Sequence, residues 1–270
     1  FIKKFLDLPK EAEEWMYDNV EGDIKLEGLY AEYDLKNNQL VEKSLNGKAQ
    51  IKEAKIRFHK DVDVIQTKNL DITFKDDNLH FDLVEPIFKG KSLAGSFVTI
   101  HNLASAQNGE VEVHIEANSK LDKDILDILK AYKINLPLLQ KSGNTNAKLT
   151  LIFPYELEKP MTTKGEFLVS DALISIGNFA FNSKNATVIL DGSNVLVKDA
   201  NFKYKDMIDA LVNINIDTKT LKSSGDAVIN SLIIKKDNGE KIVEIKDKKT
   251  PLEMDFNKET IISLKDLETT

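Results

Sequence analysis

The 270-residue chain has no cysteine, which excludes disulfide bridges, thiol catalysis and cysteine-bound zinc. It has no run near the roughly 20 apolar residues that a membrane-spanning helix needs. Its 12 glycines form no phosphate-binding loop. The 37 basic side chains are outnumbered by 44 acidic ones, and the two signs are interspersed without a basic stripe. We therefore expect no nucleic-acid partner and no cofactor.

Alternation of apolar and polar residues fills most of the chain. Apolar residues recur at every second position, as at Leu79, Phe81 and Leu83. Turn-forming pairs separate such runs, among them Asp76-Asp77 and Asn46-Gly47. Because Asn, Asp and Gly tolerate positive φ, these pairs are typical of tight hairpins. The pattern predicts a mainly β fold, with a long antiparallel sheet that is apolar on one face.

Two segments carry helical spacing instead, near 9–20 and 120–132. Pro9 is a favourable first-turn residue for the first, and an apolar stripe follows it. In the second, Ser119 is the predicted N-cap and Asp122 its capping-box partner. We expect two short helices that dock on the sheet.

Two stretches of the chain resemble each other, which indicates related β units. The segment 47–56 matches 165–174, and in both the apolar phase moves by one residue at the same place. One extra residue that keeps the same face apolar is what a β-bulge provides. The sequence therefore predicts a bulge near Glu53 and another near Asp171.

The repeat divides the chain into a first unit over residues 1–155, which includes both helices, and a second over 156–270, truncated at its C-terminus. The sequence begins with Phe1 rather than Met. We therefore expect a piece of a longer protein, whose own N-terminus and any anchor lie outside it.

Candidate catalytic and metal-binding groups do not converge in the sequence. His80 and His114 each stand between two apolar strand residues, so they should face solvent rather than a shared metal ion. Acidic pairs such as Asp61 and Asp63 leave a glycosidase as a minor alternative, although polar strand faces and turns explain them more simply. No nucleophile motif is present. We predict a protein that is not an enzyme and holds no metal.

Several of these segments together resemble the AsmA-like superfamily, and most closely its YhdP and TamB-like branch. The recurring strand pattern Gly-x-apolar-x-apolar-x-acidic-Ala carries the likeness, at 47–54 and again at 165–172. The other matching segments are Leu8-Pro9, Trp15-Met16, Val20-Glu21-Gly22, Leu93-Ala94-Gly95-Ser96-Phe97 and Leu149-Thr150-Leu151-Ile152-Phe153-Pro154.

The resemblance implies a periplasmic protein of Gram-negative bacteria, anchored in the inner membrane by an N-terminal segment that is missing here. Its strands would form a highly curved, open, repeating β-groove that carries phospholipid acyl chains between the inner and outer membranes, together with envelope partner proteins. Period-two spacing selects the side chains expected to line the groove, and Phe97 joins them by its phase with Leu93. They are Ile72, Phe74, Phe81, Leu83, Phe97, Val188, Leu190 and Val197.

The alternation also fits a second interpretation. A one-sided apolar face is buried either against another layer of the same protein or against acyl chains. In the first case the protein is a structural β-repeat of the cell envelope, with a closed core and no lipid cargo. Both arrangements share the same sequence pattern.

Overall fold

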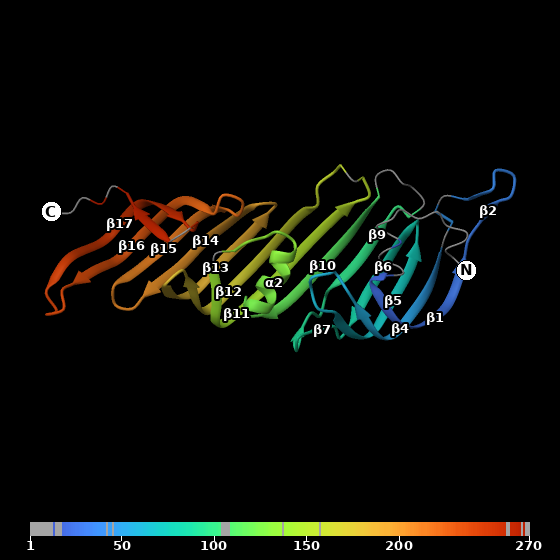
Figure 1. Ribbon diagram of the computed structural model, residues 1–270, viewed down its shortest axis with the longest axis horizontal. Helices are drawn as coiled ribbons and strands as arrows, with labels where there is room; N and C mark the ends of the chain where they lie inside the picture. Colours follow the sequence, from blue (N-terminus) through green and yellow to red (C-terminus); the bar gives the residue numbers. More distant parts are fainter. Residues whose placement is uncertain are drawn as a thin grey trace. The chain divides into compact units, whose positions relative to one another are not determined.

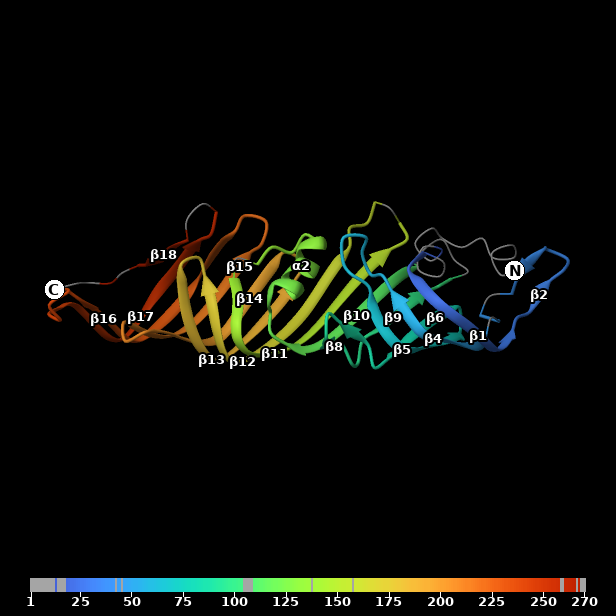
Figure 2. The ribbon, with the colours of Figure 1, turned by 60° about the horizontal axis from the view of Figure 1, so that its bottom comes forward.

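The computed structural model describes residues 13, 18–41, 43–44, 46–103, 109–136, 138–156, 158–257, 260–265 and 267. They form a 16-stranded antiparallel sheet and a separate two-stranded hairpin, β2-β3. The main path of the sheet follows the chain, from β1 through β4, β5, β6, β9 and β10 to β11 and on to β18 (Figure 1 and Figure 2). The sheet is open, with β1 and β18 at the ends of this order, so the predicted antiparallel fold is confirmed.

The bounds of the elements are β1 (Val20–Tyr30), β2 (Tyr33–Asp34), β3 (Gln39–Leu40), β4 (Asn46–Ile56), β5 (Ile65–Lys75), β6 (Asn78–Val84), β7 (Ile87–Phe88), β8 (Lys91–Ser92), β9 (Phe97–His101), β10 (Glu110–Ser119), α2 (Lys123–Ala131), β11 (Leu138–Pro154), β12 (Thr162–Ile176), β13 (Phe179–Asp191), β14 (Asn194–Tyr204), β15 (Ile208–Asp217), β16 (Lys222–Lys235), β17 (Lys241–Asp255) and β18 (Ile261–Leu264).

The chain divides into two compact units. The first comprises Phe1–Ala117 and Lys148–Thr163, and the second Asn118–Ala147 and Lys164–Thr270. The helix α2 belongs to the second unit by this division, whereas the repeat groups it with the first. The division of the repeat near residue 155 stays a prediction, because compactness does not test whether two segments are related.

The apolar residues that recur at every second position form one buried face of the sheet. In β15, Val212, Ile214 and Ile216 are buried, and the residues between them are more exposed. In β6 the same holds for Leu79 and Phe81. Burying an aliphatic or aromatic side chain of this size contributes about 1.5–3 kcal/mol, so the alternation drives the sheet to hide one side.

The turn predictions hold where residues adopt positive φ. Asp76 and Asp77 have φ of 51° and 60° between β5 and β6. The pair Asn46-Gly47 is not a turn, and that prediction was wrong, because it opens β4. There the missing side chain of Gly47 lets β4 lie close to the backbone of Gly28 in β1.

The helix predicted at 120–132 is confirmed as α2, but its cap differs. Asp122, not Ser119, is the N-cap, and its side chain accepts a hydrogen bond from the amide of Ile125. Ser119 still belongs to β10, so it is not free to start a helix. Burial raises the pKa of Tyr132, which follows the helix, above its ordinary value. Of the helix predicted at 9–20, residues 9–12 and 14–17 lie outside the described residues, and Val20 begins β1.

The bulge predicted at Glu53 in β4 is confirmed. The buried side chains change phase there, from Ile51 to Ala54, and Glu53 has a φ of 47°. Against β1 the register shifts in this stretch, so β4 holds one residue more than its neighbour. Against β5 the register is continuous, because β5 changes phase as well, between Thr67 and Leu70.

Asp171 in β12 shows the same predicted change of phase. Burial moves from Phe167 to Ala172, and Asp171 has a φ of 46°. The register with β13 is continuous. The extra residue disturbs the pairing between β14 and β15, where the register shifts and Asp199 has a φ of 50°. The one-residue change in which positions are buried is therefore shared by β12, β13 and β14, and it ends at β15.

Two glycines lie against these bulges from the adjacent strands. A Cβ on Gly143 in β11 would overlap the carbonyl of Asp171 and lie 2.6 Å from the Cα of Ala172. A Cβ on Gly22 in β1 would lie 3.1 Å from the carbonyl oxygen of Lys52. The absent side chains let the bulged backbone approach its neighbour.

Replacing Gly143 by Ala should lower the free energy of unfolding by at least about 2 kcal/mol. Its φ of 85° is left-handed, which costs an L-residue about 1–2 kcal/mol, and the overlap with the β12 backbone adds to this. Gly28→Ala is the matched control, because no heavy atom lies within 4 Å of a Cβ there. Urea denaturation followed by circular dichroism measures both, and equal losses would contradict the role assigned to Gly143.

Candidate functional site

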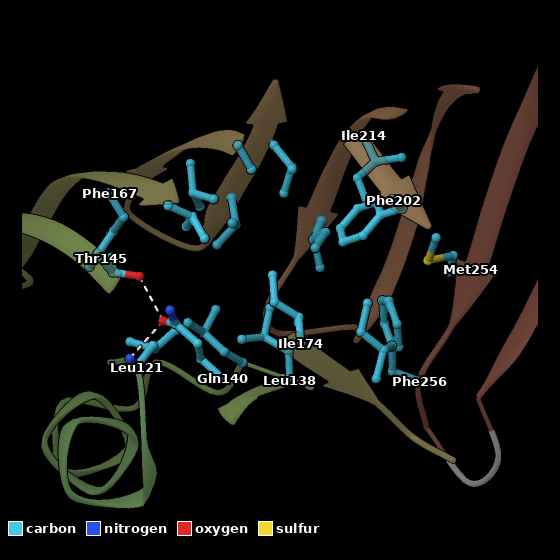
Figure 3. Close-up of a pocket in the computed structure, with 18 residues that line it drawn as sticks. Leu121, Leu138, Gln140, Thr145, Phe167, Ile174, Phe202, Ile214, Met254 and Phe256 are labelled. Carbon is cyan, nitrogen blue, oxygen red and sulfur yellow. Dashed lines mark hydrogen bonds between the residues drawn. The ribbon is translucent and has the colours of Figure 1, made fainter. Parts of the chain in front are cut away.

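The second unit contains an apolar cavity of about 70 Å³, called here the first cavity. Its 18 lining residues come from β11 to β15, from β17 and the residue that follows it, and from the segments on either side of α2 (Figure 3). Figure 3 shows Leu138, Ile174 and Phe202 reaching toward one another from different elements. Sixteen of the lining residues are apolar and none is charged. The cavity can therefore hold an apolar group but offers no ion pair.

The two polar lining residues, Gln140 and Thr145, bind each other. The Gln140 Oε1 atom accepts hydrogen bonds from the Thr145 hydroxyl at 2.7 Å and from the Leu121 amide at 2.8 Å (Figure 3). The side-chain Nε2 atom of Gln140 donates to the Ser142 carbonyl at 3.2 Å. These bonds hold the segment before α2 against β11 and satisfy polar groups that would otherwise lie unpaired in an apolar wall.

A second apolar cavity, also of about 70 Å³, adjoins the first in the same unit. It is lined by residues of β12 to β18, and its far side includes Ile262 and Leu264 of β18. Ile176, Phe202 and Met254 line both cavities. We call these three residues the waist. Again no charged residue belongs to the lining.

The structure places the predicted groove residues of the second unit on this buried face. Val188 and Val197 line the first cavity. Leu190 is also buried, 3% exposed, and pairs across the strands with Val195, which lines the cavity. Their contact with lipid stays a prediction.

The predicted groove residues of the first unit share one buried face. Ile72 pairs with Phe81 across β5 and β6, and Leu83 stands two residues further along the same face. Phe74 is buried too and lines a separate open hollow beside Leu29 of β1. Neither the first nor the second cavity includes any of these four residues.

Phe97 lies on the opposite face, so its predicted place on the apolar side was wrong. It pairs across the strands with Asp82 and with His114, and the His114 ring stacks on it at a centroid distance of 4.7 Å. The turn at Ala94-Gly95 separates Phe97 from the buried Leu93 and resets the alternation between them. Counting in twos across a turn gave the wrong face.

Polar side chains surround Phe97 on that face of the first unit. His114 bonds to Glu116 at 3.2 Å, and Lys148 reaches the same carboxylate oxygen at 3.2 Å. These contacts, with the hydrogen bond to His114 first, lower the pKa of Glu116 below its ordinary value. The ionised Glu116 carboxylate therefore contributes fully to the stability of the fold at pH values above the ordinary pKa of a glutamate. This contribution is lost as the pH falls through the lowered pKa. His80, predicted to face solvent, also lies here, 3.1 Å from Asp82.

Three acidic side chains named in the sequence analysis make contacts within the fold. Asp122 caps α2, and Asp63 pairs with Lys89 at 2.9 Å. Asp77 accepts a hydrogen bond from the Lys43 amide at 2.7 Å. Across the described ranges, no three His, Asp or Glu residues are grouped so as to bind a metal ion, and no helix is long and apolar enough to span a membrane.

Sequence reasoning missed most of the first cavity. Phe167, Ile174 and Ile214 carry the same period-two signal as Val188, and extending the selection along β12 and β15 would have found them. Leu121 and Met254 could not be found in this way. They reach the cavity from the helix connection and from a strand far along the chain, and no local pattern indicates that meeting.

A sequence model of the family described as YhdP protein matches residues 6–258. The matched range includes α2, the strands β1 to β17 and every residue that lines the first cavity. No curated protein and no solved structure matches the chain.

Replacing Gln140 by Leu should lower the free energy of unfolding by at least about 2 kcal/mol. Leucine is close to the glutamine in size, but it leaves the Leu121 amide and the Thr145 hydroxyl without their acceptor in a buried place, at about 1–3 kcal/mol for each unpaired group. Gln50→Leu is the matched control, because Gln50 is only partly buried and bonds to Asp71 at the surface.

Both variants are measured by urea denaturation. Adding Thr145→Val to the Gln140 variant should recover part of the loss, because the stranded hydroxyl is gone. A Gln140→Leu protein as stable as the Gln50→Leu protein would show that these bonds do not hold the cavity wall.

Proposed function

The chain belongs to the YhdP family, and from this membership we propose that it is a non-catalytic lipid-transfer element of the Gram-negative cell envelope. Its apolar face would hold the acyl chains of phospholipids. The observation that carries the proposal is the uncharged cavity of the second unit, which lies on the buried face of an open sheet.

The chemistry of this cavity favours acyl chains over other small molecules. Each methylene that enters an apolar site contributes about 0.8 kcal/mol, and a chain needs no hydrogen-bonding partner. Pockets for polar metabolites instead carry a few convergent polar groups that fix orientation. Gln140 and Thr145, which line the first cavity, use their polar atoms on each other and on the backbone.

The headgroup of a bound phospholipid would stay outside the cavity. A phosphate taken into an apolar site without a partner would lose its hydration at a large cost in free energy. No lysine or arginine lines the first cavity, so the wall offers no compensating charge. The lipid would lie with its chains toward the sheet and its polar end in water.

We place this activity in the periplasm, between the inner and outer membranes, as the resemblance to the AsmA-like superfamily implies. In that setting the full-length protein would be anchored at the inner membrane and would work with envelope partner proteins. The segment described here would supply part of the path for the lipid.

Val188→Asp should remove bound phospholipid from a protein that remains folded. Val188 lines the first cavity and is only partly buried, so water can solvate the new carboxylate when no lipid is present. Mass spectrometry of lipid that copurifies with the chain, read beside circular dichroism melts, measures both effects. Leu168→Asp is the matched control, because Leu168 is 47% exposed and lies outside the lining.

The proposal fails if the wild-type protein carries no phospholipid after purification and takes up none from vesicles. That result, with a Val188→Asp protein that unfolds, would instead favour the structural β-repeat with a closed core. Equal lipid in the wild type and in Val188→Asp would show that the chains do not lie in this cavity.

A further inference from the structure

The two cavities of the second unit lie in series. Three residues of the waist, Ile176, Phe202 and Met254, belong to both linings, so the spaces meet there. Each waist side chain is nearly buried, between 7% and 9% exposed. These three side chains therefore stand between the two spaces.

We propose that the two cavities form one site for a single acyl chain, and that the waist determines how long a chain the site accommodates. The inference rests on the proposed function, since it takes the ligand to be a lipid. A short chain fills the first cavity and ends at the waist. A longer chain passes it and continues into the second cavity, toward Ile262 and Leu264 of β18.

The size of the spaces favours one chain. Each cavity has a volume of about 70 Å³, well below the roughly 300–1,000 Å³ of pockets that enclose a drug-sized ligand. Only a slender part of a larger molecule can enter, and an extended hydrocarbon chain has that form. A second chain of the same lipid would lie elsewhere on the apolar face.

Met254 is the adjustable member of the waist. Its side chain is unbranched and has three rotatable bonds, so it can shift to admit a chain where a branched or aromatic side chain would resist. It stands on β17 opposite Ile262 of β18, which lines the second cavity. A bulkier residue at this position should close the passage from one cavity to the other.

The site should also be indifferent to the headgroup. Neither cavity has a charged lining residue, and the hydrogen-bonding groups of Gln140 and Thr145 are paired within the protein. Binding would therefore follow the length of the chain, while anionic and zwitterionic lipids with the same chain would bind about equally well.

The test measures affinities of the full 270-residue chain for lysophosphatidylcholines from butanoyl to stearoyl, below their micelle-forming concentrations. In the wild type, affinity should rise by about fourfold for each added methylene until both cavities are filled, the equivalent of about 0.8 kcal/mol. Lysophosphatidylglycerols with the same chains should bind within about threefold of the choline lipids, because no lining charge distinguishes them.

Met254→Phe should bind the shortest chains as the wild type does, but its gain in affinity should stop at a shorter chain. Met207→Phe is the matched control, since Met207 is 37% exposed in the turn after β14 and should leave the chain-length series unchanged. Met254→Ala opens the waist and should raise the preference for long over short chains. Circular dichroism melts establish which variants are folded.

The outcomes separate the inference from the proposed function. Phospholipid binding with the same chain-length limit in the wild type, Met254→Phe and Met254→Ala would overturn the role of the waist and leave the proposed function standing. A preference of more than tenfold for one headgroup would overturn the single-chain site in the same way. No binding of any lysolipid or phospholipid by the wild type would defeat both.

Discussion

An open sheet that is apolar on one face must cover that face with something other than water, and the rest of this structure follows from that requirement. In the second unit the cover is assembled from several sources: the side chains of neighbouring strands, the segments around α2 and the final strand β18. These parts meet incompletely. The remaining space is narrow and has no charged lining residue, so it suits a hydrocarbon chain better than a polar ligand.

The same requirement explains the bulges. A strand that slipped by one residue would turn its whole apolar set toward water. At Glu53 and Asp171 an extra residue keeps the buried face continuous, and the neighbouring strand changes phase with it. Gly22 and Gly143 then supply the space that the displaced backbone needs. The bulge with its facing glycine therefore occurs twice, and each time it keeps the apolar side chains on the buried face.

Local patterns in the sequence predict the local features of the fold. Alternation predicts the strands, and the shared slip predicts the phase changes, because both depend on neighbours along the chain. Phe97 was misplaced because a turn interrupts the count, and Ser119 was misread as a cap because β10 extends through it. Such local reasoning could not predict the waist. Ile176 and Met254 meet only after β12 and β17 have been arranged in the sheet, and no pattern near either residue records the other.

The connection between β10 and β11 has a consequence for how this fold changes over evolution. Adjacent antiparallel strands need only a tight turn, as between β12 and β13, yet this connection carries α2. Its two ends meet, because the Gln140 amide donates to the Leu121 carbonyl at 3.1 Å and the Leu121 amide returns to the Gln140 side chain. The two ends are therefore joined by direct contacts that do not involve the residues of α2. We expect the helix at this point to tolerate changes in length and sequence while the sheet keeps its register, so the covering of the cavity should diverge faster than the sheet beneath it.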